Sequence, residues 1–464
     1  MTRSVDVLIV GAGVQGVTAA CEAARRGLSV ALVDRGDIGG AASSNSMKIA
    51  HGGLRYLQSL DVRRSLVSIR ERRRLLRLAP GLVRPLPCRL DMAGRGLAFR
   101  LGFRAGLLLN DALSADRNRG VRADRRIPSS RYPVWHDALI DDTERMLLAF
   151  VHAAVDARPD TVVWTHSRCD PVVRDGRVAG AHDPSRGHVR ARCVLDCTGA
   201  ASGDRPAMVS MNLVVDRLPL VSDGVAVALA HPDDGRSVFV VPWRDRTIVG
   251  TWNTELDGRS GEAVRIDAAR IDAVLDWLAP VHPELAALDR GSVRLVHAGA
   301  VPRDVGEEPV PSDLPRLVER DDGTILVSGV KWTTAYGLTV RALDLVGRRL
   351  SSGSAAAPAM PLPDVAARIA AYCEAEPALG RPVANGCRVT VGAVRFAVEQ
   401  QWAQTLDDVL ARRTGLASGG HPGRRIARAV AEHLQPVLDW TDAERDLEIE
   451  AFDDAPRFAG NVPD

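Results

Sequence analysis

Short apolar runs, separated by glycine and charged residues, mark the first elements of the chain. Residues 5–10 form one such run, as expected for a parallel strand buried on both faces. An alanine-rich helical segment follows through Ala19 and Ala24, and Gly27 is a good terminator for it. A second apolar run over residues 29–33 ends at Asp34. The pattern predicts a β-α-β unit at the start of the chain.

The turn between the first strand and the helix is rich in glycine, with the order Gly11-Ala12-Gly13-Val14-Gln15-Gly16. Such a pattern is strong evidence for a dinucleotide site only when it follows a strand, begins a helix and precedes an acidic residue at the end of the next strand. All three conditions hold here. The glycines let the backbone approach a pyrophosphate, which the helix N-terminus attracts. Asp34 would accept hydrogen bonds from ribose hydroxyls, so the unit predicts a dinucleotide site.

Helix and strand patterns alternate along the rest of the chain. Helices are predicted over about residues 63–78, from 141 onward and over 334–350, and strands over 161–164, 169–173, 177–181, 191–196 and 324–327. Residues 205–300 are mostly strand-like, which indicates an antiparallel sheet inserted between nucleotide-binding segments. A small-residue linker at 351–358 precedes a mostly helical end. The arginine run at 70–74 is interpreted as a solvated helix face.

Composition narrows the class of protein. The hydrophobic fraction of 46% and the charged fraction of 25% are those of an ordinary globular protein. A net charge of +2 argues against a nucleic-acid binder. No apolar stretch approaches the ~20 residues of a membrane span, and there is no signal-peptide pattern. Residues 97–109 are apolar with interspersed arginines, so a helix there packs on the protein's own core, the favoured interpretation, or lies on a bilayer surface.

Cysteine usage indicates the redox compartment. The seven cysteines are scattered, odd in number and without a C-x-x-C pair. This pattern favours buried thiols over a disulfide framework or a zinc site. We therefore expect a cytoplasmic protein without a metal centre.

Lysine is rare in this chain, and both lysines lie in segments of distinctive sequence. Lys48 follows a serine-rich stretch at 43–46, and Lys331 precedes Trp332 after a predicted buried strand. Nearly every other cation is arginine, which does not replace lysine where a compact, rotatable ammonium is required. The two positions are therefore candidates for chemistry.

Several further segments have distinctive sequences, namely HGGLRYL at 51–57, VPW at 241–243, KWTT at 331–334 and TLDDVLARRT at 405–414. With the glycine-rich turn, they give the chain a resemblance, nearly end to end, to the FAD-dependent glycerol-3-phosphate dehydrogenases. These belong to the wider group of D-amino-acid-oxidase-like flavoproteins. The segment at 51–57 is the most specific of the motifs.

The resemblance implies an FAD cofactor extended across the first domain, with the flavin ring near His51 and Lys331. The implied cofactor-binding residues are Gly11, Gly13, Gln15, Gly16, Asp34, Ser43, Ser44, Lys48, Gly52, Gly53, Val173, Gly199, Gly329 and Thr333. Lys48 is expected to support the phosphate side of the cofactor, whereas Lys331 is the stronger catalytic candidate.

The implied chemistry is hydride transfer from a carbinol carbon to the flavin, with loss of the hydroxyl proton. Histidine as a residue type can change charge near neutral pH, and a lysine ammonium can give up its proton when it is partly buried, so either His51 or Lys331 could take the proton. Arg55 is the expected cation for an anionic substrate group. The implied substrate-binding residues are Arg55, Tyr56, Arg303, Arg316, Lys331 and Thr333.

The sequence departs from the family pattern at a substrate-binding position. The family has arginine where this chain has Val301, and Arg316 lacks the polar neighbours usual in the family. Arg303 could substitute, because residues two apart on a strand share a face. Alternatively, the substrate is a different hydroxy or amino compound, oxidised by a flavin oxidase or dehydrogenase. A flavin-binding protein without catalysis is the third alternative.

These inferences combine into an α/β fold with three parts. A Rossmann-like FAD-binding domain comprises residues 1–90, 135–204 and 290–350, and a substrate or cap domain built on an antiparallel sheet comprises 91–134 and 205–289. Residues 359–464 form a C-terminal helical domain. The expected partner is a small hydroxylated substrate, with or without phosphate, and no nucleic acid. Quinone, oxygen and a carrier protein stay open as electron acceptor, as do a homodimer and contact with the inner face of the membrane.

Overall fold

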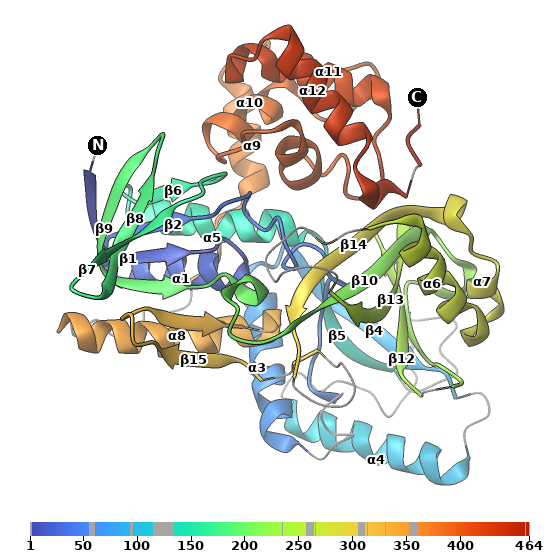
Figure 1. The fold of residues 1–464 in the computed structure, drawn as a ribbon. Helices are drawn as coiled ribbons and strands as arrows, with labels where there is room; N and C mark the ends of the chain where they lie inside the picture. Colours follow the sequence, from blue (N-terminus) through green and yellow to red (C-terminus); the bar gives the residue numbers. More distant parts are fainter. Residues whose placement is uncertain are drawn as a thin grey trace.

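The computed structural model describes residues 2–54, 61–92, 96–114, 134–233, 235–256, 264, 266–304, 311–312, 314–329, 331–351, 360–459 and 461–463. Within these ranges the chain forms two large sheets and a group of C-terminal helices (Figure 1). All seven cysteines lie in the described ranges and are free, as predicted, and five of them are buried.

The first sheet contains the predicted β-α-β unit. Its central strand β1 (Thr2–Val10) pairs in parallel with β2 (Val30–Val33) on one side and with β9 (Gly187–Asp196) on the other. The full strand order is β15-β16-β9-β1-β2-β6, in which the outer strands are β6 (Val162–Trp164), β15 (Arg316–Glu319) and β16 (Ile325–Ser328). A hairpin of β7 (Asp170–Arg174) and β8 (Arg177–Asp183) lies beside β9. All four residues of β2 are buried, as expected for a strand covered on both faces.

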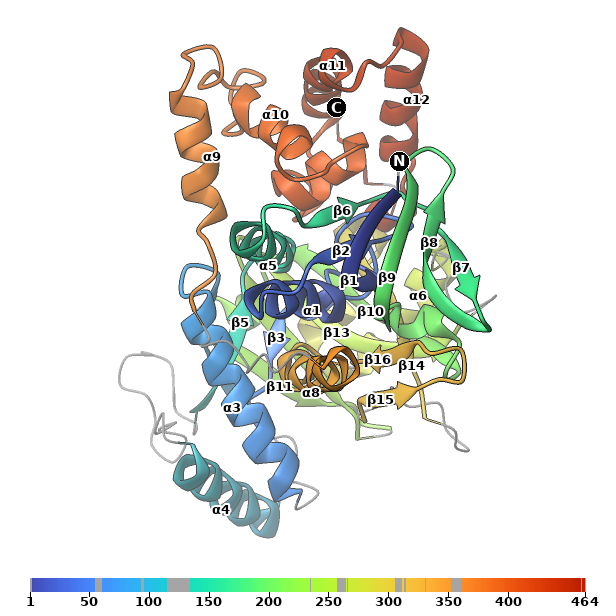
Figure 2. The ribbon, with the colours of Figure 1, turned by 90° about the vertical axis from the view of Figure 1, so that its left-hand side faces the viewer.

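Three helices pack together against this first sheet (Figure 2). Helix α1 (Val14–Arg25) lies between α5 (Thr143–Ala157) and α8 (Trp332–Leu350). Alanines and valines on α1 share one apolar core with the strands and with both neighbouring helices. The Asp142 side chain accepts from the Arg145 amide and so caps α5, which places the start of that helix where the sequence predicts it.

The second sheet, here called the cap sheet, lies beside the first (Figure 1). Its order is β14 (Val293–Pro302), β10 (Ala207–Asp216), β13 (Arg246–Glu255), β12 (Ser237–Trp243), β11 (Ala226–Ala230), β4 (Val83–Leu90), β5 (Val134–Ile140) and β3 (Ile49–Ala50). Helices α6 (Ala268–Leu278) and α7 (Pro283–Ala286) share an apolar core with it. Helices α3 (Val62–Leu78) and α4 (Leu97–Leu113) complete this side of the molecule.

Sheet membership differs in places from the domain boundaries that the sequence suggests. Residues 83–90 and 293–302 were expected in the FAD-binding domain, yet both segments are hydrogen-bonded into the cap sheet. A division by sheets therefore assigns them to the cap. The domain boundaries themselves stay a prediction.

The C-terminal helices pack against the first sheet's loops through a buried charge cluster. They are α9 (Val365–Glu374), α10 (Val391–Glu399), α11 (Arg424–Leu438) and α12 (Asp442–Asp453), with a wide helical turn at Asp408–Arg413. Arg413 donates to both oxygens of Asp37, at 2.7 and 2.5 Å. Asp408 accepts from Arg412 at 2.7 Å and lies 2.8 Å from His166 Nε2. The guanidinium groups bridge the carboxylates of this cluster. The cluster links the C-terminal helices to the loops of the first sheet, and we call it the ionic joint.

Replacing Asp37 tests whether this joint holds the C-terminal helices in place. Removing one partner of a buried ion pair costs about 3 kcal/mol or more, so Asp37→Asn should lower the free energy of unfolding by roughly that amount. Asp160→Asn is the matched control, because Asp160 is exposed and pairs with Arg158 on the surface, where such a pair contributes less than about 1 kcal/mol. Urea denaturation followed by circular dichroism measures both. Equal losses in the two variants would contradict the role of the cluster.

Candidate flavin and substrate site

The glycine-rich turn after β1 is shaped by contacts that only glycine permits. Gly11 has a φ of 103°, and a Cβ there would lie 2.7 Å from the Cys197 carbonyl oxygen. A Cβ on Gly16 would lie 1.7 Å from the Gly11 carbonyl oxygen. Gly13 differs, because its Cβ would meet only the Ser43 hydroxyl, at 3.0 Å. Gly11 and Gly16 thus serve the turn itself, while Gly13 keeps its outer side open to a ligand.

Asp34, at the end of β2, braces the same turn. Its carboxylate accepts from the Ala12 amide at 2.6 Å and from the Gly36 amide at 2.8 Å. Burial raises the pKa of Asp34 above its ordinary value, although these two amides oppose the shift. A role toward ribose hydroxyls stays a prediction, but the structure places the carboxylate at the edge where the sequence expects the ribose.

The serine loop at 43–48 folds back on the start of α1. The Val14 amide donates to Ser43 Oγ at 2.9 Å, and the Trp332 indole donates to the Ser43 carbonyl at 3.2 Å. Ser44 is 5% exposed, and its hydroxyl has no hydrogen-bond partner among the described residues. The loop therefore joins the glycine-rich turn to the start of α8 and offers an unused buried hydroxyl.

Lys48 holds this loop against the start of α5. Its buried ammonium donates to the Ser44 carbonyl at 2.8 Å, to Thr143 Oγ1 at 2.6 Å and to Glu144 Oε1 at 2.8 Å. These three acceptors match the three N–H donors of an ammonium. The contacts fit the supporting role expected for Lys48.

Gln15 joins the glycine-rich turn to Gly329. Its side-chain amide donates to Thr339 Oγ1 at 2.7 Å and to the Ala335 carbonyl at 3.2 Å, while Oε1 is buried and without a partner among the described residues. A Cβ on Gly329 would lie 2.5 Å from that oxygen. Unpaired buried acceptors and hydroxyls are costly unless something completes them. The free Oε1, the Ser44 hydroxyl and the open side of Gly13 fit a bound dinucleotide.

His51 and Asp137 form a histidine-carboxylate pair beside the predicted flavin loop. Among the described residues, this loop has no other such pair. His51 Nδ1 lies 3.0 Å from Asp137 Oδ2, and the other carboxylate oxygen accepts from the Gly52 amide at 2.6 Å. Burial opposes ionisation of Asp137, but the bonds from His51 and Gly52 hold the pKa of Asp137 below its usual value. The ionised carboxylate fixes Nδ1 as the protonated nitrogen, which leaves Nε2 as the acceptor.

Gly52 and Gly53 pack tightly on α3, where one sequence interpretation was wrong. A Cβ on Gly52 would lie 2.6 Å from the Arg72 guanidinium, and one on Gly53 would lie 2.7 Å from the Ser65 carbonyl. Arg72 is only 2% exposed and donates to the His136 carbonyl. The arginine run is therefore not a solvated face throughout. Helical periodicity turns Arg72 inward, and the absence of a side chain at Gly52 makes room for it.

Lys331 and Thr333 lie at the start of α8. Lys331 is half-buried and stands at the N-cap position, where its backbone amide donates to the Thr334 hydroxyl at 3.2 Å. Thr333 is 4% exposed. The Trp332 bond to the serine loop places this helix start beside the predicted cofactor loop. A catalytic role for Lys331 stays a prediction.

Of the remaining predicted substrate residues, the two that lie in the described ranges, Arg303 and Arg316, both contact the segment 204–206. Arg55 and Tyr56 lie outside the described residues. Arg316 Nη1 pairs with Asp204 Oδ2 at 2.8 Å, so an internal carboxylate already holds it. Arg303 follows β14, and its backbone amide donates to the Pro206 carbonyl at 2.9 Å. Val301 pairs with Met208 on β10.

Arg205 is a cation of this region that the sequence reasoning missed. Its guanidinium donates to Ser312 Oγ at 2.5 Å and to Ser328 Oγ at 3.4 Å. Its buried Nε makes no hydrogen bond within the described residues and lies 3.8 Å from Asp204 Oδ2, and its Nη1 lies 3.7 Å from Asp304 Oδ1. Burial lowers the pKa of Arg205, although neighbouring aspartates oppose the shift. Ser328 directly precedes Gly329, so this arginine lies next to the predicted flavin contact. No motif marks it, because the contact joins residues 123 positions apart.

Two further predicted contacts lie at the edges of the site. Gly199 has a φ of 63° and is the first residue of a short helical turn. The Cys197 carbonyl, which packs against Gly11, comes just before this turn. Val173 lies on β7 and is 57% exposed. Its contact with the adenine stays a prediction.

Replacing Gly13 separates cofactor binding from folding. The Cβ of Gly13→Ala would meet only the Ser43 hydroxyl in the folded chain but would occupy the side open to a ligand, so we expect a folded protein that retains much less flavin. Gly81→Ala is the control, because a Cβ there meets nothing within 4 Å. The ratio of flavin to protein absorbance after purification measures retention. Full flavin occupancy in Gly13→Ala would contradict the predicted path of the cofactor.

The described geometry has counterparts in solved structures. The glycerol-3-phosphate dehydrogenase from Bacillus halodurans, solved as a complex with FAD, superposes with a TM-score of 0.72 at 20% identity and covers 99% of this chain and 95% of its own. Glycine oxidase from Geobacillus kaustophilus gives a TM-score of 0.51 at 17% identity over 75% of this chain and 95% of its own. At these identities the likeness establishes the fold, including the arrangement of two sheets.

Sequence relatives and family models agree with the fold. Glycerol-3-phosphate dehydrogenase 2 of Mycobacterium tuberculosis is 27% identical over 97% of this chain and 87% of its own length. Residues 364–445 match the C-terminal domain of alpha-glycerophosphate oxidase. Residues 6–341 match the family model described as FAD dependent oxidoreductase, and that range holds the glycine-rich turn, His51 and Lys331. The chain belongs to the FAD dependent oxidoreductase family.

Proposed function

We propose that the protein is a dehydrogenase that oxidises the secondary alcohol of glycerol 3-phosphate, or of a closely related hydroxylated compound, to a ketone. The observation that carries the proposal is His51, which is held by Asp137 and whose ring centroid lies 5.4 Å from that of Phe239 in the cap sheet. Its support is the similarity along nearly the whole chain to a protein named glycerol-3-phosphate dehydrogenase 2.

The reaction removes a hydride from the carbinol carbon and a proton from its hydroxyl group. When bound, FAD supplies the acceptor for the hydride and its two electrons. His51 takes the hydroxyl proton at Nε2, while Asp137 holds the ring orientation and stabilises the imidazolium that forms. A proton transfer positioned in this way contributes typically 10²–10⁴-fold to a rate, as an order-of-magnitude estimate.

The rest of the proposed site binds and orients the substrate. Lys331 and Thr333 flank Trp332 at the start of α8, whose indole bonds to the serine loop, and we assign them to the substrate side. The anionic group of the substrate is held by arginine, for which Arg55 and Arg303 are the candidates from sequence and Arg205 is the candidate from structure. Guanidinium offers two parallel donors to a phosphate and suits this role.

A different substrate is the second candidate, because of Val301. A valine side chain cannot replace the charge-assisted bonds of the family arginine, each worth roughly 1.5–3 kcal/mol. Arg316 already pairs with Asp204 and is a poor replacement. In this alternative a hydroxy or amino compound that is larger or less charged is oxidised by the same residues, and reoxidation by oxygen releases peroxide.

Helix α4 is the basis for our proposals on the electron acceptor and on contact with a membrane. Among the helices in the described ranges, none is both long and apolar enough to cross a bilayer. Only Leu107 and Asn110 of α4 are buried, so this helix does not pack on the core along its length as the sequence interpretation favoured. Leu97, Leu101 and Leu108 are 73%, 56% and 56% exposed.

These leucines share one helix face with Arg104, because positions three and four apart are neighbours on a helix. An apolar face with an arginine on it suits the surface of an anionic bilayer. Figure 2 shows α4 at the lower edge of the molecule, beside the start of α3. We place peripheral membrane contact on α4, which favours a membrane quinone over oxygen or a carrier protein as acceptor.

Anaerobic mixing tests the proposed substrate and the proposed base together. Glycerol 3-phosphate should bleach the flavin absorbance of the FAD-loaded protein, and His51→Asn should slow bleaching by about 10²-fold or more without loss of bound FAD. His188→Asn is the control, since His188 is exposed on β9. If FAD is bound and bleaching fails in the unaltered protein, glycerol 3-phosphate is not the substrate. Peroxide production with an amino or other hydroxy compound would then favour the alternative.

Charged residues on α4 test the membrane contact. Burying an exposed leucine in lipid contributes about 1.5–3 kcal/mol, so a Leu101→Asp, Leu108→Asp double variant should lose most of its binding to vesicles that contain anionic lipid. Leu447→Asp is the matched control, because Leu447 is 63% exposed on α12. Co-sedimentation measures binding. Equal binding by the double variant and the control would rule out α4 as the contact.

A further inference from the structure

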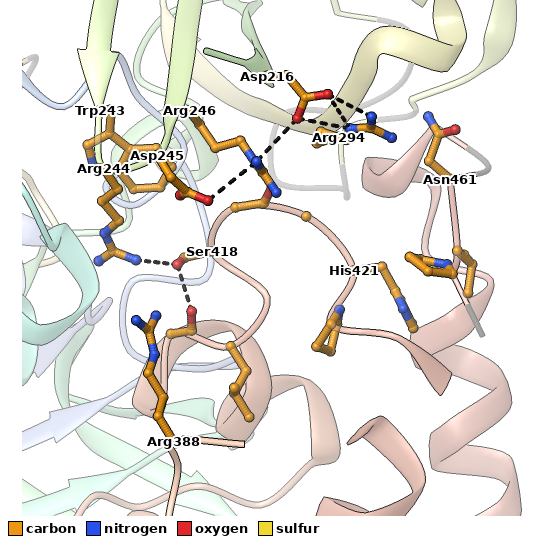
Figure 3. A pocket seen from close by; sticks show the side chains of 17 residues that line it. Asp216, Trp243, Arg244, Asp245, Arg246, Arg294, Arg388, Ser418, His421 and Asn461 are labelled. Carbon is orange, nitrogen blue, oxygen red and sulfur yellow. Dashed lines mark hydrogen bonds and ion pairs between the residues drawn. The ribbon is translucent and has the colours of Figure 1, made fainter. Parts of the chain in front are cut away.

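A cavity opens between the turn of β12 and β13 and the C-terminal helices (Figure 3). Its volume is about 710 Å³, within the range of small-molecule sites. The cap sheet contributes Arg244, Arg246 and Arg294 to its wall, and the C-terminal part contributes Arg388 and Ser418. The cavity is therefore built from two domains and lined by groups that bind anions.

The cavity lies at the opposite end of the cap sheet from the proposed substrate site. Arg294 lines the cavity at the start of β14, whereas Val301 lies near the end of that strand, roughly 23 Å away at ~3.3 Å per residue. On β12, Phe239 contacts the His51 ring and Trp243 lines the cavity. The two sites are thus separate, with one sheet running between them.

Positive charge is in excess along the cavity wall. Four arginines line it against two aspartates. Asp216 is neutralised by Arg294, at 2.7 Å, and by Arg246, at 3.2 Å, and the hydrogen bond from Arg294 lowers its pKa. Arg244 pairs at 3.1 Å with Asp142, which is not part of the wall. The aspartates therefore hold the arginine side chains in place, and the cavity wall keeps a net positive charge.

Arg388 is held by no hydrogen bond or ion pair within the part of the chain that the structure describes. It is exposed and points into the cavity (Figure 3). Across the cavity, Arg244 donates to the Ser418 hydroxyl, and Arg246 Nε donates to the Gly419 carbonyl at 3.1 Å. The turn of the cap sheet thus already reaches the C-terminal loop that precedes α11, and Arg388 adds a free cation to that junction.

We propose that this cavity is a binding site for a small polyanion that carries phosphate or carboxylate groups. The ligand is held between Arg388 of the C-terminal part and Arg244 and Arg246 of the cap sheet. Guanidinium groups bind such oxygens in pairs of parallel hydrogen bonds. Because the ligand contacts both domains, binding stabilises their junction. The inference is independent of the substrate proposed above.

Isothermal titration calorimetry of the FAD-loaded protein with inorganic pyrophosphate or citrate tests the site, in the presence of saturating glycerol 3-phosphate. We expect saturable binding of at least one probe and a higher unfolding temperature in its presence, because a ligand that binds only the folded state stabilises it. The two probes distinguish phosphate from carboxylate recognition. Potassium chloride at the same ionic strength should give neither effect. Because glycerol 3-phosphate itself carries phosphate, it can compete at either site. Binding that disappears when it is added, and that Arg388→Ala leaves unchanged in its absence, would place the anion in the substrate site and overturn the proposal.

Arginine variants assign the binding to this cavity. Arg388→Ala should weaken the affinity about tenfold, the effect of losing one charge-assisted interaction, and Arg388→Lys should weaken it less. Arg428→Ala is the matched control, because Arg428 is exposed on α11 and does not line the cavity. Arg388 has no hydrogen-bond or ion-pair partner among the described residues, so folding should be unaffected. Unchanged affinity in Arg388→Ala, or no saturable binding of either probe, would overturn the proposal.

Discussion

The buried ammonium of Lys48 is the constraint on which both functional halves of the molecule depend. It ties the serine loop to the start of α5 through Ser44, Thr143 and Glu144, and its Nζ lies 5.4 Å from the centre of the Trp243 ring in the cap sheet. Burial opposes ionisation of Glu144, yet Lys48 holds its pKa below the ordinary value. Removing either charge would leave the other buried and uncompensated. The loop predicted to meet the cofactor and the sheet proposed to cover the substrate are thereby fixed relative to one another.

Local pattern predicted the fold of the segment around the glycine-rich turn, while the cofactor contacts themselves stay a prediction. The β-α-β unit, the glycine-rich turn and Asp34 lie within one short stretch of chain, so periodicity and turn chemistry determine them. The ionic joint could not be found in this way, because Asp37 and Arg413 are 376 positions apart. Arg72 was misread for a related reason. The space that it fills depends on Gly52 in another loop, which the sequence of its own helix does not reveal.

The substrate half was predicted only in part. His51 was identified from its motif, but its partner Asp137 lies 86 positions away on β5 and carries no local signal. Arg205 was missed because its role follows from serines brought close by β16 and by the loop before β15. The scarcity of lysine did point to two useful positions. Structure then distinguished them, since Lys48 is enclosed by three acceptors while Lys331 stands half-buried at a helix start.

The central claim is that hydride leaves the carbinol carbon of glycerol 3-phosphate in a site organised by His51 and Asp137. Its most direct test compares flavin bleaching by glycerol 3-phosphate that carries hydrogen or deuterium at C2, after rapid anaerobic mixing with the FAD-loaded protein. The account predicts bleaching by both compounds and a slower rate with deuterium, because the C2 bond breaks in that step. Absence of bleaching by either compound, with FAD fully bound, would contradict the account.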